Sequence, residues 1–383
     1  MPAVASPASR PLLATILVLG AASGALAATP PPIPPAPRVT VFVGVAPCDG
    51  GSRGKACEPL RLETDQRFDE SFPEGKACVG DKADCDAARN LRLAVRGFFH
   101  NGGPALWVVP FPRVPAAGEV DEALRKLAHA RDVAFLAAPG LTDPALQTLL
   151  VHHAEATGAF AVLDGPADPR VDAAAVVGAL PPSAAAALYH PWLSVREPLT
   201  RRAVPTPPSG HVTGLLASLD ATRRFSPAGR TLSGVEGLVA PVGVDRVSQL
   251  RAARVDVPPI VALARATGTP VTLSTALESR YVALTLLRNH LRRSITAGTA
   301  WAATAANDQA TWSALVGQVD SFLYDAWRLG TLMGSKPAEA WFVRCDRTTM
   351  TQADLDAGRT VLLYGFAPLK PAEFVVDQLV IAR

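Results

Sequence analysis

Three apolar runs decide the fold class of this chain: ALWVVPF (105–111), VAFLAAP (133–139) and FAVLD (160–164). Each is short and rich in β-branched or aromatic residues, as buried strands are. The residues between them are predicted to be helices, at 120–130 and 144–156. Strands that alternate with helices of about a dozen residues predict βαβ units and a largely parallel sheet, so the fold class is α/β.

The same alternation continues upstream and then weakens downstream. VTVFVGV (39–45) alternates as a strand does, and residues 86–99 form an apolar helical face that ends at the NGG turn at 101–103. Residues 165–210 are rich in Pro and Ala and are expected to form short helices and long loops. Residues 211–278 show no clear pattern.

The C-terminal part is predicted to be an α+β unit. A helix is expected at 279–296, and Asn307 is a predicted N-cap for a second helix that ends at Gly330. Three strands follow it: AWFVRC (340–345), TVLLYGF (360–366) and EFVVDQLVIA (373–382). The last strand is apolar on both faces apart from Asp377 and Gln378. It therefore needs a partner, either its own sheet or that of a neighbour.

Composition excludes several classes of protein. Of 383 residues, 49% are hydrophobic and 19% are charged, which is enough apolar surface for a sizeable core and excludes a disordered chain. The 37 basic residues against 34 acidic ones give a net charge of +3, too balanced for a nucleic-acid partner. A single uncharged apolar stretch approaches membrane length, which excludes a polytopic membrane protein.

That stretch lies at the N-terminus. Arg10 precedes an uncharged run from Leu12 to Ala28 that closes on Ala25-Leu26-Ala27, the pattern of a secretory signal peptide over residues 1–27. A buried helix, a wrongly chosen start or a retained anchor are the alternatives, and no other lipid contact is expected. Residues 28–38 (ATPPPIPPAPR) are predicted to be an extended proline-rich linker outside the core.

Four of the five cysteines are clustered. Cys48, Cys57, Cys78 and Cys85 lie in segments rich in Gly, Asp and Lys, so loops are expected there. Four cysteines allow three pairings, and Cys48–Cys57 with Cys78–Cys85 closes the two shortest loops. A zinc site is the rival interpretation, but no C-x-x-C pair is present. Cys345 lies in an apolar strand and is expected to be a buried thiol.

No set of residues assembles an active site. His152 and Glu155 could share a helix face, but two ligands without a third do not make a zinc site. SGHVTG (209–214) is faintly similar to the helix that carries the histidine of subtilisin-like proteases, but neither the aspartate nor the serine of that pattern is present. No G-x-G-x-x-G or Walker A run occurs. We therefore expect no enzyme, no cofactor and no metal.

The C-terminal segments carry a family resemblance. FVRCDRTTMTQADLDAGR (342–359), followed by GFAPLKPAEFVVDQLVI (365–381), resembles the C-terminal domain of contractile tail sheath proteins of phages, phage-tail-like bacteriocins and extracellular contractile injection systems. Upstream segments fall in the family's order over residues 39–382: AVRGFFHNGG (94–103), LAAPGLTDPALQ (136–147), FAVLDGP (160–166), ALYHPWLSV (187–195), PPSGHVTG (207–214), EGLVAPVG (236–243) and ESRYVALTLLRNHLRRSITAGTAWAATAAND (278–308).

The resemblance implies a structural role. Sheath subunits stack as rings around an inner tube, exchange terminal strands with neighbours and contract by a change of packing, so the implied partners are further copies, the inner tube and the baseplate. It also implies a subtilisin-like core domain at 39–255 and a sheath C-terminal domain at 256–383. The implied subunit-linking strand contains Phe374, Val376, Leu379 and Ile381. The alternative is that this strand closes the subunit's own sheet.

Some features depart from the family. Residues 253–278 lack the expected pattern, and Arg292 and Arg293 stand where an acidic pair is common. The signal-like segment and the cysteines are foreign to a particle built in the cytoplasm. An exported, disulfide-bonded, sheath-derived module that binds a surface or partner is therefore the alternative, located in the periplasm or outside if the signal is cleaved. Otherwise the chain is cytoplasmic or part of a phage-tail-like particle. A hydrolase that uses His211 is the third hypothesis.

Overall fold

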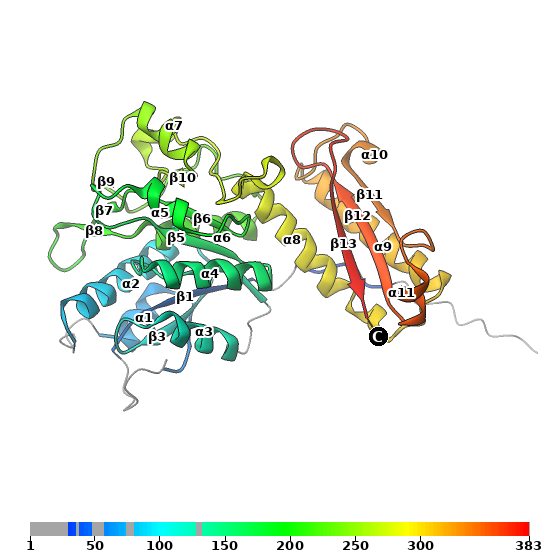
Figure 1. Ribbon diagram of the computed structural model, residues 1–383, viewed down its shortest axis with the longest axis horizontal. Coiled ribbons are helices and arrows are strands. Elements are labelled where there is room, and N and C mark those ends of the chain that lie inside the picture. Colours follow the sequence, from blue (N-terminus) through cyan, green and yellow to red (C-terminus); the bar gives the residue numbers. More distant parts are fainter. Residues whose placement is uncertain (1–29, 36–37, 48–56, 74–79, 128–131, 383) are drawn as a thin grey trace, which may run out of the picture.

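The computed structural model describes residues 30–35, 38–47, 57–73, 80–127 and 132–382. The predicted signal peptide, residues 1–27, lies outside them, as do Cys48 and Cys78. Figure 1 shows two lobes, a larger α/β core lobe and a smaller C-terminal lobe, with one long helix running between them. Among the helices of these residues, none is both long and apolar enough to cross a membrane.

The core lobe is built on a mixed sheet. Its order is β10-β6-β5-β4-β1-β3-β2, parallel throughout except for β2, which pairs antiparallel with β3. β3 and β4 lie on opposite sides of β1. After β3 the chain therefore crosses β1, and β4, β5 and β6 extend the sheet on its other side. The strands are β1 (Val39–Val45), β2 (Leu60–Leu62), β3 (Leu106–Phe111), β4 (Val133–Ala137), β5 (Phe160–Asp164), β6 (Ala186–Tyr189) and β10 (Val255–Asp256).

Helices cover both faces of this sheet, so its strands are buried on both sides. Along β1, Phe42 enters one core cluster while Val41 and Val43 enter the other. The first face carries α2 (Lys82–His100) and α6 (Pro208–Ala221). The second carries α3 (Ala117–Lys126), α4 (Pro144–Thr157), α5 (Ala173–Ala179) and α7 (Val244–Ala252). The predicted α/β class is confirmed.

Helices α2 and α6 pack unusually close together because glycines face the contact. A Cβ added to Gly214 would lie 2.7 Å from the Cα of Phe98 and closer still to its carbonyl oxygen. A Cβ on Gly210 would likewise meet the backbone of Ala94, and one on Gly97 would meet the ring of His211. This side of the core therefore depends on residues without side chains.

The segment predicted as broken loops contains a second, small sheet. β7 (Leu193–Arg196) pairs antiparallel with β8 (Ala203–Thr206) and with β9 (Gly237–Leu238). Residues 253–278, which had no readable pattern, also pack on the core lobe. Leu273 is buried, and its N–H donates to the carbonyl of Ala186 on β6 at 2.9 Å.

The C-terminal lobe packs two helices against a three-stranded antiparallel sheet of order β11-β12-β13. One hydrophobic cluster runs from α2 and α6 through α8 into this lobe, so the two lobes share a continuous core. The elements are α8 (Val282–Gly298), α9 (Gln309–Arg328), α10 (Pro337–Ala340), β11 (Trp341–Arg344), α11 (Gln352–Asp356), β12 (Thr360–Phe366) and β13 (Val375–Ile381), with 3-10 turns at Val261–Leu263, Leu277–Ser279 and Ala300–Thr304.

The predicted N-cap of α9 is wrong by one residue. Asp308 is the cap, and its carboxylate accepts from the Thr311 N–H at 2.9 Å. The side-chain oxygen of Asn307 instead accepts from the Trp312 indole at 2.7 Å and from the Thr360 hydroxyl at 2.9 Å. Asn307 therefore joins α9 to β12 instead of capping the helix.

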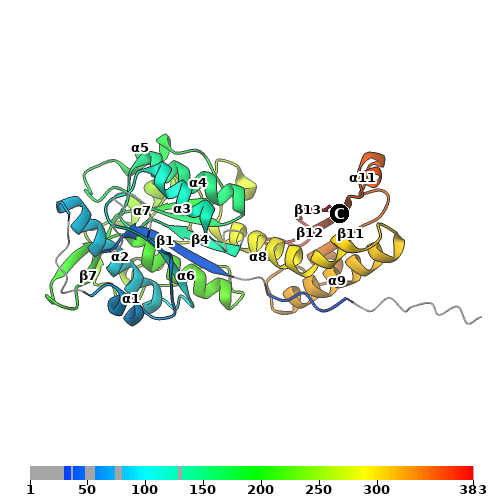
Figure 2. The ribbon, with the colours of Figure 1, turned by 90° about the horizontal axis from the view of Figure 1, so that it is seen from below.

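The proline-rich segment is not wholly outside the core, contrary to expectation. Ile33 is buried, and a Cβ on Gly298 would lie 2.7 Å from it. The Gln318 amide donates to the Pro31 carbonyl at 2.7 Å. Figure 2 shows this dark blue segment passing along the C-terminal lobe before the chain enters β1. Residues 30–35 thus strap the N-terminal part of the chain to its own C-terminal lobe.

Candidate functional site

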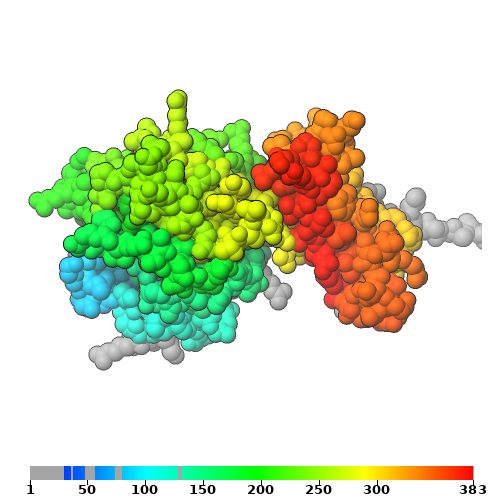
Figure 3. Space-filling model, turned by 45° about the horizontal axis from the view of Figure 1, so that its top comes forward, coloured from blue at the N-terminus to red at the C-terminus, as the bar shows by residue number. Residues whose placement is uncertain are grey.

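The last strand, β13, lies at one edge of the three-stranded sheet of the C-terminal lobe. β13 pairs with β12 along its whole length, from Thr360↔Ile381 to Phe366↔Val375. Its other edge pairs with no strand of the described residues. In Figures 1 and 3 the strand, red, lies on the side of its lobe that faces the core lobe. An unpaired edge of this kind offers N–H and C=O groups to another strand.

The predicted linking residues do not share one face of this strand. Val376 is 48% exposed on the outer face, where Val380, which was not among the predicted linking residues, is 46% exposed. Leu379 and Ile381 point to the opposite face, toward the lobe interior. Phe374 precedes the strand and packs edge-on against Phe342, with ring centroids 5.3 Å apart.

An ion pair fixes β13 to the interlobe helix. The Asp377 carboxylate accepts from Nε and Nη2 of Arg288 on α8, at 3.1 and 3.2 Å. This hydrogen-bonded pairing raises the pKa of Arg288. The Tyr364 hydroxyl on β12 lies 3.5 Å from the same carboxylate, and burial raises its pKa well above the ordinary value. The strand is therefore held to α8 and to β12 at once.

A groove runs between the lobes beside this strand. It has a volume of about 480 Å³ and is lined by the end of α4, one side of α8 and Leu379 of β13. We call it the strand groove. Its charged residues are of both signs, Asp132 and Glu155 on the core side and Arg292 and Arg293 on α8. A neighbouring chain that reached β13 would meet a mixed polar surface here.

A buried charge cluster joins the lobes beneath α8. The Asp220 carboxylate of α6, 1% exposed, lies 2.6 Å from Nε of Arg38, 3.6 Å from Nδ1 of His290 and 3.7 Å from Nη2 of Arg293. Burial by itself raises the pKa of Asp220, but His290, Arg293 and Arg38 together hold it below the ordinary value. Burial lowers the pKa of His290. One carboxylate thus connects α6, α8 and the start of β1.

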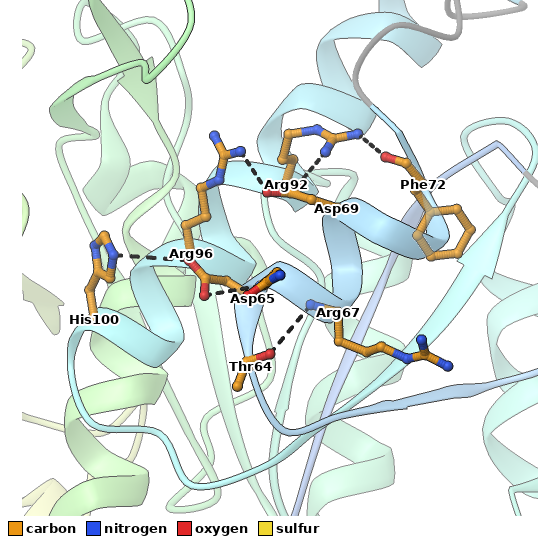
Figure 4. Close-up of polar contacts among 9 residues, drawn as sticks. Thr64, Asp65, Arg67, Asp69, Phe72, Arg92, Arg96 and His100 are labelled. Atoms are coloured by element: carbon orange, nitrogen blue, oxygen red, sulfur yellow. Dashed lines mark hydrogen bonds and ion pairs between the residues drawn. The ribbon is translucent and has the colours of Figure 1, made fainter.

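A second polar cluster fixes α1 (Asp65–Ser71) on α2 (Figure 4). Asp69 accepts from Arg92 at 2.5 Å and from Arg96 at 2.8 Å, and Arg92 also donates to the Phe72 carbonyl. The Arg92 guanidinium lies 5.4 Å from the ring centroid of Phe68. These contacts hold α1, which lies in the sequence between the two pairs of clustered cysteines, on α2.

The carboxyl ends of the core strands hold a buried aspartate with a structural task. Asp164, at the end of β5, accepts from the Ser209 N–H and Oγ at 2.7 Å and from the Gly140 N–H at 2.9 Å. Burial raises its pKa to about 6. The carboxylate therefore pins the first turn of α6 to the loop after β4.

His211 is not placed for hydrolysis. It is 1% exposed, faces Gly97 of α2, and its Nδ1 has no hydrogen-bond partner in the described part of the chain. Burial lowers its pKa to about 4. A general base must reach a substrate, and this ring does not. Within the described residues, no group of three or more His, Cys, Asp or Glu side chains could hold a metal ion, and His152 and Glu155 are part of none.

The described cysteines lie at one end of the core sheet. The Cys57 N–H donates to the Pro110 carbonyl at 2.8 Å, near the end of β3. Cys85 lies in the first turn of α2, where its neighbour Asp84 accepts from the Val114 N–H at 2.7 Å. Cys345 is the free cysteine of the described residues, and it is buried as expected. The pairing of the other four involves residues outside the described ones and stays a prediction.

Taken together, these features define a two-lobed α/β protein whose terminal strand leaves a sheet edge open. No family model matches the chain, and no curated protein matches it either. Several solved structures, in contrast, are similar to this chain. The sheath of an extracellular contractile injection system, PVC, in its contracted state is 24% identical, with a TM-score of 0.68 over 98% of each chain.

Two further structures agree. The contracted helical sheath of the anti-feeding prophage is 23% identical, with a TM-score of 0.70 over 95% of this chain and 99% of that one. A sheath tail protein of Desulfitobacterium hafniense is 8% identical, with a TM-score of 0.62 over 92% and 98%. The chain therefore has the contractile-sheath fold along nearly its whole length, which confirms the predicted resemblance at the level of the fold.

Proposed function

We propose that this protein is the structural subunit of a contractile sheath-like tube, assembled from copies of itself by strand exchange and working by a change of packing. The observation that carries the proposal is the combination of a sheath fold over nearly the whole chain with the free edge of β13. Its proposed partners are further copies and, by analogy with the sheath and baseplate complexes that share the fold, a baseplate. The resemblance in sequence adds an inner tube to these proposed partners.

The physical basis is an interface between unlike surfaces. A strand edge on one copy that accepts a terminal segment of the next is a heterologous contact, and repeated heterologous contacts build rings or open helices. The exposed Val376 and Val380 add an apolar surface beside that edge. No hydrolysis or cofactor is required, because the energy of such a transition is stored in the packing of the subunits.

Electron microscopy of the purified full-length chain tests the proposal, with rings or tubes as the expected result. A doubly charged variant, V376K/V380K, should abolish them, since lysines beside a strand edge oppose further pairing. V244K, at a 62% exposed valine on α7, is the matched control and should still assemble. A strictly monomeric wild-type protein with residues 1–37 retained, or assembly that the double lysine variant leaves intact, would contradict the proposal.

A second candidate is an exported, disulfide-bonded sheath-derived module without a contractile role. The two described members of the cysteine cluster both lie near the end of β3. The Cys57 N–H donates to the Pro110 carbonyl, and Asp84, the neighbour of Cys85, accepts from the Val114 N–H. The intact mass of the non-reduced protein from its host decides it. A 28–383 chain lighter by about 2 Da for each disulfide supports export; a full-length chain with free thiols contradicts it.

A further inference from the structure

A second groove opens between the lobes, away from the free edge of β13. It has a volume of about 490 Å³. Its walls come from the loop after α6, the first turns of α8, the residues after α9 and the loop between β12 and β13. These four segments meet around the first turns of α8, at the end of the helix where the chain leaves the core lobe. We call it the arginine groove.

Its charge is of one sign. Arg223, Arg224 and Arg230 all line it, whereas no Asp or Glu is among its lining residues. Within the described residues none of the three forms an ion pair, in contrast to Arg38, whose nearest carboxylate is 2.6 Å away. The strand groove, by comparison, contains carboxylates as well as arginines. The arginine groove therefore presents guanidinium donors that the chain itself does not satisfy.

Its floor and far wall are apolar. Leu284 and Leu287 of α8 and Phe225 form the buried part. Leu329, Met333 and Leu369 line the side of the C-terminal lobe and are 61%, 45% and 56% exposed. Large aliphatic side chains at this exposure, gathered around one hollow, mark a surface that gains from being covered.

We infer that the arginine groove binds a short segment of a partner protein that carries carboxylates beside aliphatic side chains. The guanidinium forks suit carboxylates, which they bind with paired hydrogen bonds. The apolar wall suits leucine-like side chains on the same segment. Because the groove is formed by both lobes, an occupant contacts the loop after α6 and the end of α9 together. The inference stands whether or not the protein forms tubes.

Isothermal titration calorimetry on the full-length chain tests it with two capped pentapeptides, LELEL and its uncharged counterpart LQLQL. We expect saturable binding of LELEL that weakens as salt is raised, and binding of LQLQL that is weaker by about tenfold or more. The R224Q/R230Q variant should lose a similar factor, and L369S should weaken both peptides. R347Q, at an exposed arginine on the turn after β11, is the matched control and should bind as wild type.

Each other outcome overturns the inference. Equal binding of the two peptides, or unchanged binding by R224Q/R230Q, removes the role of the arginines. Dodecanoate binding that depends on the arginines, without peptide binding, would assign the groove to an anionic amphiphile. Self-association that R224Q/R230Q abolishes, without peptide binding, would assign it to a second copy. The substituted side chains are exposed, so each variant is expected to fold. Urea unfolding of each variant checks that a loss of binding does not come from misfolding.

Discussion

Replacing Gly214 by alanine should destabilise the core lobe, although alanine is the better helix former. Gly214 lies within α6 (Pro208–Ala221), and its added Cβ would lie 2.7 Å from the Cα of Phe98 on α2. Ordinary carbon–carbon contacts are about 3.5–4.0 Å, so the two helices must separate by roughly 1 Å. The obstacle is backbone, which a rotamer change cannot relieve.

The size of the effect follows from two opposing contributions. Overpacking of a tight core costs about 1–3 kcal/mol. The higher helix propensity of alanine raises the free energy of unfolding by about 1 kcal/mol. Because the contact is with backbone, we take the upper part of the overpacking range, and we expect the free energy of unfolding to fall by about 1–2 kcal/mol. The measurement is urea unfolding followed by far-ultraviolet circular dichroism, with the change in midpoint converted through the wild-type slope.

A matched control separates crowding from propensity. Gly317 lies in the middle of α9 (Gln309–Arg328), and an added Cβ there meets nothing within 4 Å. G317A should therefore raise the free energy of unfolding by about 0.5–1 kcal/mol. A G214A protein as stable as wild type, or shifts of both variants in the same direction, would contradict the expected crowding between α2 and α6.

Three further predictions concern buried charges and the terminal strand. Burial raises the pKa of Asp256 to about 8, so the folded protein keeps a proton that the unfolded chain releases near pH 4, and stability falls as pH rises between these values. The D256N variant should lose this part of the decline of the urea midpoint with rising pH. Plots of midpoint against pH that run parallel for wild type and D256N would contradict the prediction. D220N leaves Arg38, His290 and Arg293 without their carboxylate and should cost about 3–5 kcal/mol. The control is D86N, which removes the surface ion pair with Lys82 and should unfold as wild type does. An equally small effect of D220N and D86N would contradict a stabilising role of the buried cluster around Asp220. D377N loses the ion pair with Arg288, so hydrogen exchange should quicken in β13 and stay unchanged in β11, and equal exchange in β13 would count against that anchor.

Local periodicity predicted the core elements well. The strands at 39–45, 160–164 and 360–366 occur with those bounds, because each is an unbroken apolar run buried in a sheet. The small sheet was missed for a physical reason. β8 contains Pro205 and β9 has two residues, so neither carries a strand pattern, and each is a strand only through its pairing with β7.

The site was predicted in part. An apolar terminal strand that needs a partner was expected, either in its own sheet or in that of a neighbour, and the structure pairs one of its edges with β12. Its side chains were assigned without regard to face. Val380 could have been found from the sequence, since it alternates with Val376 on the same side of the strand. Asp220 could not, because it meets Arg38 and His290, which are distant in the sequence and carry no common motif.

The sequence by itself determined the α/β alternation, the existence of a separate C-terminal unit and the apolar terminal strand. Periodicity encodes which residues of an element are buried, and that information is local. Only the tertiary structure decided the order of the strands, which edge of β13 stays open, how closely α2 and α6 approach at Gly214 and which arginines are left without a carboxylate. These depend on contacts between distant segments, where close packing and the pairing of buried polar groups select one arrangement among many that share the same local pattern.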